Sequence, residues 1–95
     1  MKLNTYNQNH NELDTISAKV QKAKQLVHVG SKYRHYKSIG MYEVISIGII
    51  EATEEPVVIY QALYGDKLTW IRPIPDFLAT VEKDGKPCPR FEEIR

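Results

Sequence analysis

The sequence predicts a mainly β domain, a small SH3-like barrel of five strands preceded by one N-terminal amphipathic α-helix. The chain has 95 residues, which suits one small domain and is too short for two. Apolar residues recur at helical spacing before residue 30 and at alternating positions after it. Turn residues then separate five short apolar runs, and one helical turn precedes the last of them, a layout typical of small bent barrels.

The first predicted element is a helix over residues 11–29, which follows a flexible segment over residues 1–10. Its apolar residues recur at spacings of three and four and form one face, made of Leu13, Ile16, Val20, Ala23 and Val27. Gly30 suits the left-handed conformation that ends many helices. This face packs on the rest of the domain or, as an alternative, on a second copy of the chain in a homodimer.

The barrel domain is expected over residues 30–95. Its five predicted strands are residues 33–37, 42–51, 57–64, 68–72 and 90–94. Gly65 and Asp66 form a tight hairpin turn, and Pro75 with Asp76 opens the helical turn. A five-stranded barrel of the OB type, the alternative, would place a longer helix where this chain has only the hairpin at residues 65–66.

Composition excludes several classes of protein. Hydrophobic residues are 42% of the chain and charged residues 26%, which is ordinary for a globular domain and too apolar for a disordered one. The longest apolar stretch, residues 44–50, is too short to span a bilayer, and the polar N-terminus has no signal-peptide core, so we expect a cytoplasmic protein with no membrane partner. A single cysteine, Cys88, excludes an internal disulfide and a zinc site built from cysteines.

The sequence carries no catalytic signature. The glycines are too dispersed for a dinucleotide or phosphate loop, no serine lies in a nucleophile elbow, and the three histidines offer no close ligand pair. We therefore expect a protein that is not an enzyme and has no cofactor and no bound metal.

Charge is unevenly distributed along the chain. Residues 1–41 carry seven Lys and Arg against two Asp and Glu, a net charge of +5, and residues 42–95 carry six against ten, a net charge of −4. The molecule is then either electrically polarised or able to pack head to tail with a copy, unless folding intermixes the two sets of charges.

The positive signal for function is a set of interleaved aromatic and basic residues. Aromatic rings stack on nucleobases while basic groups neutralise phosphates, so these residues favour a non-catalytic binding module with nucleic acid as the first candidate ligand. The candidate ligand-binding residues are Tyr33, Arg34, His35, Tyr36, Lys37, Tyr64, Trp70, Arg72 and Arg90. Strand alternation exposes only one of the two sets within residues 33–37.

A structural interpretation of the same residues stands beside the functional one. It places Trp70 and at least one tyrosine in the core and pairs Arg72 and Arg90 with acids of the second part of the chain. Two other functions also remain open. One is a protein-interaction or adaptor module that acts through the helix or a barrel edge, and the other is a small-molecule site in a groove shared by Tyr36, Tyr64, Trp70 and Arg72.

Four segments in a fixed order carry a resemblance to a known family. They are Tyr-Arg-His-Tyr-Lys at 33–37, Ala-Leu-Tyr-Gly-Asp at 62–66, Trp-Ile-Arg-Pro at 70–73, and Asp-Gly-Lys at 84–86 followed by Pro-Arg-Phe at 89–91. The chain resembles, over about residues 30–94, a family of short bacterial and phage proteins known as domain of unknown function sixteen fifty-three. The resemblance implies a compact β-rich domain and brings no activity or catalytic residue with it. The chain departs from the family pattern in two ways. In the family a glycine directly follows the first segment, whereas here Ser38 and Ile39 precede Gly40, which predicts a longer first hairpin. The N-terminal helix also lies outside the shared region.

Overall fold

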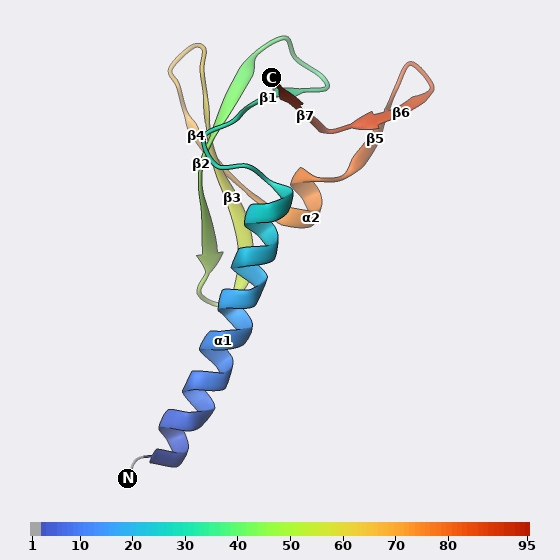
Figure 1. Ribbon diagram of the computed structural model, residues 1–95. Helices are drawn as coiled ribbons and strands as arrows, with labels where there is room; N and C mark the ends of the chain where they lie inside the picture. The colour runs from blue at the N-terminus through green and yellow to red at the C-terminus, as the bar shows by residue number, and fades with distance from the viewer. Residues whose placement is uncertain (1–2) are drawn as a thin grey trace.

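The computed structural model describes residues 3–95, with side chains described from residue 15 onward. One long helix leads into a bent sheet, and a small two-stranded ribbon lies beside it (Figure 1). The elements in chain order are α1 (Leu3–Leu26), β1 (Lys32–His35), β2 (Met41–Ile50), β3 (Glu55–Ala62), β4 (Thr69–Pro73), α2 (Ile74–Phe77), β5 (Thr80–Lys83), β6 (Lys86–Pro89) and β7 (Phe91–Ile94).

The main sheet has five antiparallel strands in the order β4-β3-β2-β1-β7. The prediction of a mainly β domain behind an N-terminal helix is therefore confirmed. The closed barrel is not observed, because β4 and β7 are the two edges of the sheet and do not pair with each other. A β-bulge between Val44 and Ser46 marks a register shift in β2, and such a bulge bends a strand without closing the sheet.

The β5–β6 ribbon was not among the predicted strands. A turn at Asp84 and Gly85 was predicted, and both residues have positive φ, 55° and 78°, as a two-residue hairpin turn requires. The flanking segment contains Pro87 and Pro89, which predicts a loop. These prolines are tolerated because the ribbon has only two strands, so each has a free edge where a missing N–H is not needed.

Helix α1 packs on its own domain through its C-terminal half. Val27 is 0% exposed, Ala23 is buried with it, and Val20 packs against the same core. The N-terminal half of the helix extends away from the sheet (Figure 1). The helix begins at Leu3, within the segment expected to be flexible, and ends at Leu26, before the turn that contains Gly30. The side chain of Leu13 lies outside the described residues.

Four aromatic rings form the centre of the core. Phe77 from α2 and Phe91 from β7 stack with their ring centroids 4.2 Å apart, and Tyr33 and Tyr60 contact Phe77 edge-on. All four side chains are buried. Because these rings fill the space between α2 and the sheet, Trp70 remains at the surface, 49% exposed, and the interpretation that places it in the core is wrong.

Within residues 3–95, no helix combines the length and the apolar character needed to cross a membrane. Helix α1 has 24 residues, but polar and charged side chains interrupt every stretch of it.

Candidate functional site

Strand pairing gathers aromatic and basic residues on one face of the bent sheet. Paired residues in antiparallel strands point to the same side, as do residues two apart in one strand. His35 pairs with Phe91 and Tyr60 pairs with Trp70, while Arg72 follows Trp70 by two residues in β4. These side chains therefore share the face that holds the core.

Arg72 is held above the aromatic core. Its guanidinium carbon lies 5.8 Å from the centroid of the Phe91 ring, and its Nε donates a hydrogen bond to the hydroxyl of Tyr60 at 3.4 Å. The side chain is half-buried. The face of the Phe91 ring stabilises the cation.

His35 lies in a positively charged environment. Its ring contacts Phe91 edge-on, with centroids 4.9 Å apart, and its Nδ1 accepts a hydrogen bond from the backbone N–H of Lys37 at 3.2 Å. Burial lowers the pKa of His35 from its usual 6.5, and the positive charges of Arg72, Arg90 and Lys37 lower that pKa further. The neutral ring, with the proton on Nε2, is the form that fits both the hydrogen bond and the field.

We call the set His35, Lys37, Arg72 and Arg90 the basic rim. Arg90 is fixed by its own contacts, since its Nη1 donates to the backbone oxygen of Asp76 at 2.9 Å. Among the described side chains, no carboxylate lies within ion-pair distance of the three cations of the rim. The structure therefore does not show the pairing of Arg72 and Arg90 with acids that the structural interpretation expected.

Tyr64 has a packing role beside this face. Its ring lies over Gly40, where an added Cβ would stand only 2.4 Å from the Cε1 atom of the ring. The hydroxyls of Tyr42 and Tyr64 share a hydrogen bond of 2.6 Å, and the two rings meet edge-on. Burial in the first place, and then this hydrogen bond, raises the pKa of Tyr42 to about 12.

The remaining candidates fall into different environments. Tyr33 is buried, and its hydroxyl accepts a hydrogen bond from the backbone N–H of His28 at 3.1 Å. Arg34 is exposed on the opposite face of β1, across from Glu92. Tyr36 contacts His35 ring to ring and has the ammonium group of Lys37 over its face, 5.6 Å from the centroid. The structure thus keeps Tyr36 and Lys37 beside His35 and places Trp70 two residues before Arg72, whereas Tyr33 is in the core. Arg34 lines one hollow with His35 and Tyr36.

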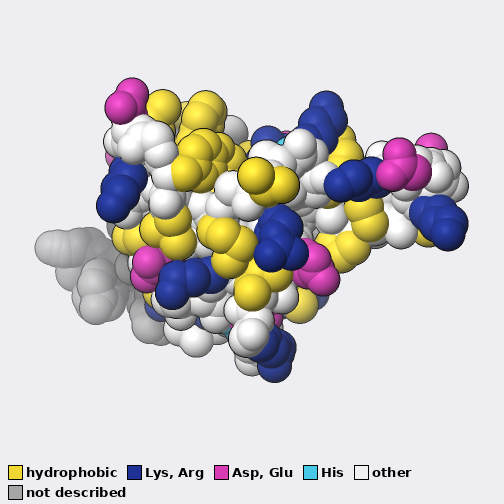
Figure 2. Space-filling model, turned by 90° about the horizontal axis from the view of Figure 1, so that it is seen from above, with side chains coloured by type: hydrophobic (Ala, Val, Ile, Leu, Met, Phe, Trp, Pro, Cys, Tyr) yellow, Lys and Arg dark blue, Asp and Glu magenta, His cyan; other side chains and the backbone are white. Residues whose placement is uncertain are grey.

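The structure adds Tyr60 and Phe91 to the site. Neither was a candidate, although Phe91 directly follows Arg90 in the sequence. Seen from above, single Lys and Arg side chains stand between apolar patches rather than in a separate block (Figure 2).

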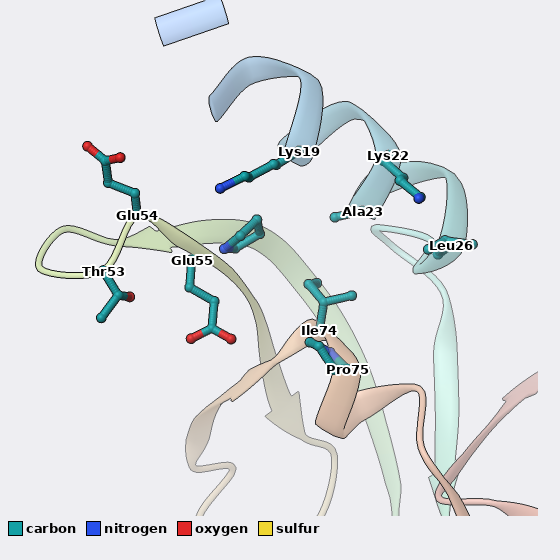
Figure 3. Close-up of a pocket in the computed structure, with 10 residues that line it drawn as sticks. Lys19, Lys22, Ala23, Leu26, Thr53, Glu54, Glu55, Ile74 and Pro75 are labelled. Carbon is teal, nitrogen blue, oxygen red and sulfur yellow. The ribbon is translucent and has the colours of Figure 1, made fainter. Parts of the chain in front are cut away.

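Away from the basic rim, a hollow of about 360 Å³ lies between α1, the turn after β2, and α2. Lys19 and Lys22 line it on the helix side, Glu54 and Glu55 on the turn side, and Ile74 on the side of α2 (Figure 3). Lys19 extends toward these glutamates, and neither lysine is part of the basic rim. Nowhere in residues 15–95 do three His, Cys, Asp or Glu side chains gather in a way that could hold a metal ion.

The fold and the site together define a small mainly β domain whose bent, open sheet presents aromatic and basic side chains at one end. Residues 31–93 match the family described as Protein of unknown function (DUF1653), and the chain belongs to this family. Its structure is similar to the crystal structure of a DUF1653 protein from Bordetella bronchiseptica, with a TM-score of 0.62 and 30% sequence identity over 68% of this chain and 85% of that one. No curated protein matches the chain.

Proposed function

We propose that this domain is a non-catalytic binding module whose basic rim takes a polyanion, with nucleic acid as the first candidate. One observation carries the proposal: the positive charges of Lys37, Arg72 and Arg90 all act on His35, and no carboxylate of the described residues lies within ion-pair distance of these three cations. Cations gathered around one site repel one another, and a bound anion removes that repulsion.

The geometry suits phosphate groups in particular. A guanidinium presents its N–H donors in a planar fork that matches the oxygens of a phosphate. Arg90 donates one hydrogen bond to Asp76, and Arg72 donates one to Tyr60. Each guanidinium group therefore has further N–H donors for a ligand. The stacked pair of Phe77 and Phe91 supports Arg72 from below, which keeps its guanidinium in place before a ligand arrives.

The test is fluorescence anisotropy with labelled single-stranded DNA, duplex DNA and RNA, each at low and at physiological salt. The double variant K37Q/R72Q removes two charges from the rim, and K24Q/K86Q removes two from exposed sites elsewhere. We expect the rim variant to weaken binding and to lower the slope of log K against log salt by roughly 0.7 for each lost contact. The control variant should leave the affinity and the salt slope nearly unchanged.

Two results would contradict the proposal. The first is the absence of binding at low salt, where attraction to phosphates is strongest. The second is equal weakening in the rim variant and the control, which would show a general charge effect. Thermal melting of each variant, and of R72K as a charge-preserving replacement, separates lost binding from lost folding.

We also propose that the sheet is an open relative of the SH3-like barrel. The order β4-β3-β2-β1-β7 supports this assignment, because the first and last strands of the main sheet are neighbours and α2 lies between β4 and the closing strand. A crystal structure of this chain in which the edges β4 and β7 approach each other would support the assignment, and one in which they diverge would contradict it.

A second candidate function is favoured by helix α1, whose N-terminal half extends away from the sheet (Figure 1). We propose that this half contacts a partner protein or a second copy of the chain. Ala23 and Val27 are already buried in the domain's own core, so the partner would use the apolar face only from Val20 toward the N-terminus. Light scattering tests the homodimer: a mass that rises with concentration and that L13D abolishes without unfolding the domain would support it, and a constant monomer mass would exclude it.

A further inference from the structure

Trp70 stands apart from the aromatic network of this domain. In the described part of the chain, every other aromatic side chain contacts at least one further ring, from Tyr33 with Phe77 to Tyr36 with His35. Trp70, the single tryptophan, has no such ring contact and is 49% exposed. A large apolar ring left half in water is the kind of surface that marks a binding site.

The position of Trp70 relates it to the basic rim. It lies in the edge strand β4, two residues before Arg72 and directly across from Tyr60. Residues two apart in a strand are separated by about 6.6 Å and point to the same face. An exposed ring and a positive charge are thus fixed side by side on a regular strand, within reach of adjoining parts of one nucleotide chain.

We propose that the ligand of this site is a single-stranded nucleic acid, with an unpaired base stacked on Trp70 and its phosphates neutralised by Arg72 and the rest of the basic rim. This inference rests on the proposed function and names its ligand class. Stacking needs the free face of a base, which an unpaired strand offers and a duplex does not. The sequence-independent geometry of stacking also means that any base can occupy the site.

Among the elements that could read duplex DNA, the β5–β6 ribbon adjoins this face, because its Lys83, Cys88 and Pro89 line a hollow with His35 and Tyr36, so a duplex probe decides between the two modes of binding. Duplex recognition in the major groove requires a helix or a two-stranded ribbon that enters the groove. Helix α1, the other candidate, packs on the sheet through Ala23 and Val27, which are buried in the core. The exposed ring of Trp70, two residues before Arg72, favours the stacking of an unpaired base.

The experiment compares three labelled probes by fluorescence anisotropy at low salt. They are an oligothymidine of about 12 nucleotides, an abasic oligomer with the same number of phosphates, and a duplex of the same length. We expect the oligothymidine to bind most tightly and to quench the fluorescence of Trp70. W70L should weaken oligothymidine binding by roughly 5- to 150-fold, the range for loss of one stacked base, and should leave the abasic oligomer unaffected. W70F should retain most of the affinity.

The outcomes separate this inference from the function on which it rests. If the oligothymidine and the abasic oligomer bind equally, or the duplex binds as tightly as the single strand, stacking on Trp70 is refuted while the basic rim still binds phosphates. If no probe binds, the proposed function itself fails. If W70L does not fold, quenching of the wild-type tryptophan by the oligothymidine but not by the abasic oligomer decides the question. Quenching that depends only on protein concentration would assign Trp70 to a protein contact and overturn the inference.

Discussion

Replacing Gly40 with alanine should displace the ring of Tyr64 and release Tyr42. The backbone of Gly40 does not have a positive φ, so the backbone accepts alanine. The added Cβ, however, would lie 2.4 Å from the Cε1 atom of Tyr64 and 2.6 Å from its Cδ1 atom. These distances are too short for any contact between carbon atoms, so the ring has to move.

The cost follows from the contacts that the ring leaves. The hydrogen bond between the two hydroxyls contributes about 1 kcal/mol, and the edge-on ring pair contributes about as much again. Alanine also stiffens the unfolded chain, which stabilises the protein by about 0.7 kcal/mol. The net expectation is a destabilisation of about 1 kcal/mol, or a fall of roughly 4–8 °C in Tm for a domain of this size.

Two measurements test this reasoning. Thermal unfolding is measured for G40A, Y64A and the double variant, because the cost of the alanine should vanish once Tyr64 has no ring. Stability is also followed from pH 9 to 12, since the pKa of Tyr42 is raised from 10.0 to about 12 in the folded protein. Between these two pKa values Tyr42 keeps its proton in the folded state and loses it in the unfolded state. Its contribution to the free energy of unfolding is therefore fully present below pH 10 and declines as the pH rises toward about 12. In G40A this alkaline decline should shrink, and an equal cost of G40A in the Y64A background would refute the steric argument.

Three further predictions concern the helix and the titratable groups. V27A removes a side chain that is 0% exposed and should lower the free energy of unfolding by about 2 kcal/mol. I16A, at a half-buried site on the same face of the helix, should lower it by less than about 1 kcal/mol. Urea unfolding measures both values, and the reverse order would place this face outside the core. The pKa of His35 lies below 6.5 in the folded state, so the unfolded state binds more protons in acid, and stability should fall as the pH drops below 6.5 in the wild type but less in H35Q. The carboxylate of the half-buried Glu93 lies 3.0 Å from Nδ1 of the exposed His28, and E93Q should lower Tm slightly at low salt and less in concentrated salt.

The regular parts of the fold were predictable because their patterns are local. The alternation in residues 42–51 predicted β2, and the Gly65–Asp66 turn predicted the β3–β4 hairpin in the right place. The closed barrel was not predictable, because closure depends on whether the edges β4 and β7 meet after the bulge in β2 and the turn of α2. No local pattern encodes that distance. The β5–β6 ribbon escaped prediction for a different reason, since its prolines are compatible with a strand only where an edge remains unpaired.

The candidate site was predictable in composition and not in geometry. Alternation divided residues 33–37 into two sets but could not decide which set faces the core. The pairing of His35 with Phe91 settles this, because it fixes one set over the aromatic core and leaves Arg34 on the opposite face. Trp70 shows the limit of reasoning from size alone, since the large ring stays outside when smaller rings from α2 and β7 already fill the interior.

The position of the helix lysines determines how tightly the rim can bind. The net charge of +5 over residues 1–41 does not form one surface with the rim, because Lys19 and Lys22 line the hollow opposite Glu54 and Glu55. The rim itself then supplies three cations, Lys37, Arg72 and Arg90, to neutralise phosphates. Three contacts to a single strand give a slope of log K against log salt of about −2, since each contributes about −0.7. A measured slope much steeper than this would show that the ligand extends beyond the rim to further cations, and a slope near zero would show that phosphates are not what the rim binds.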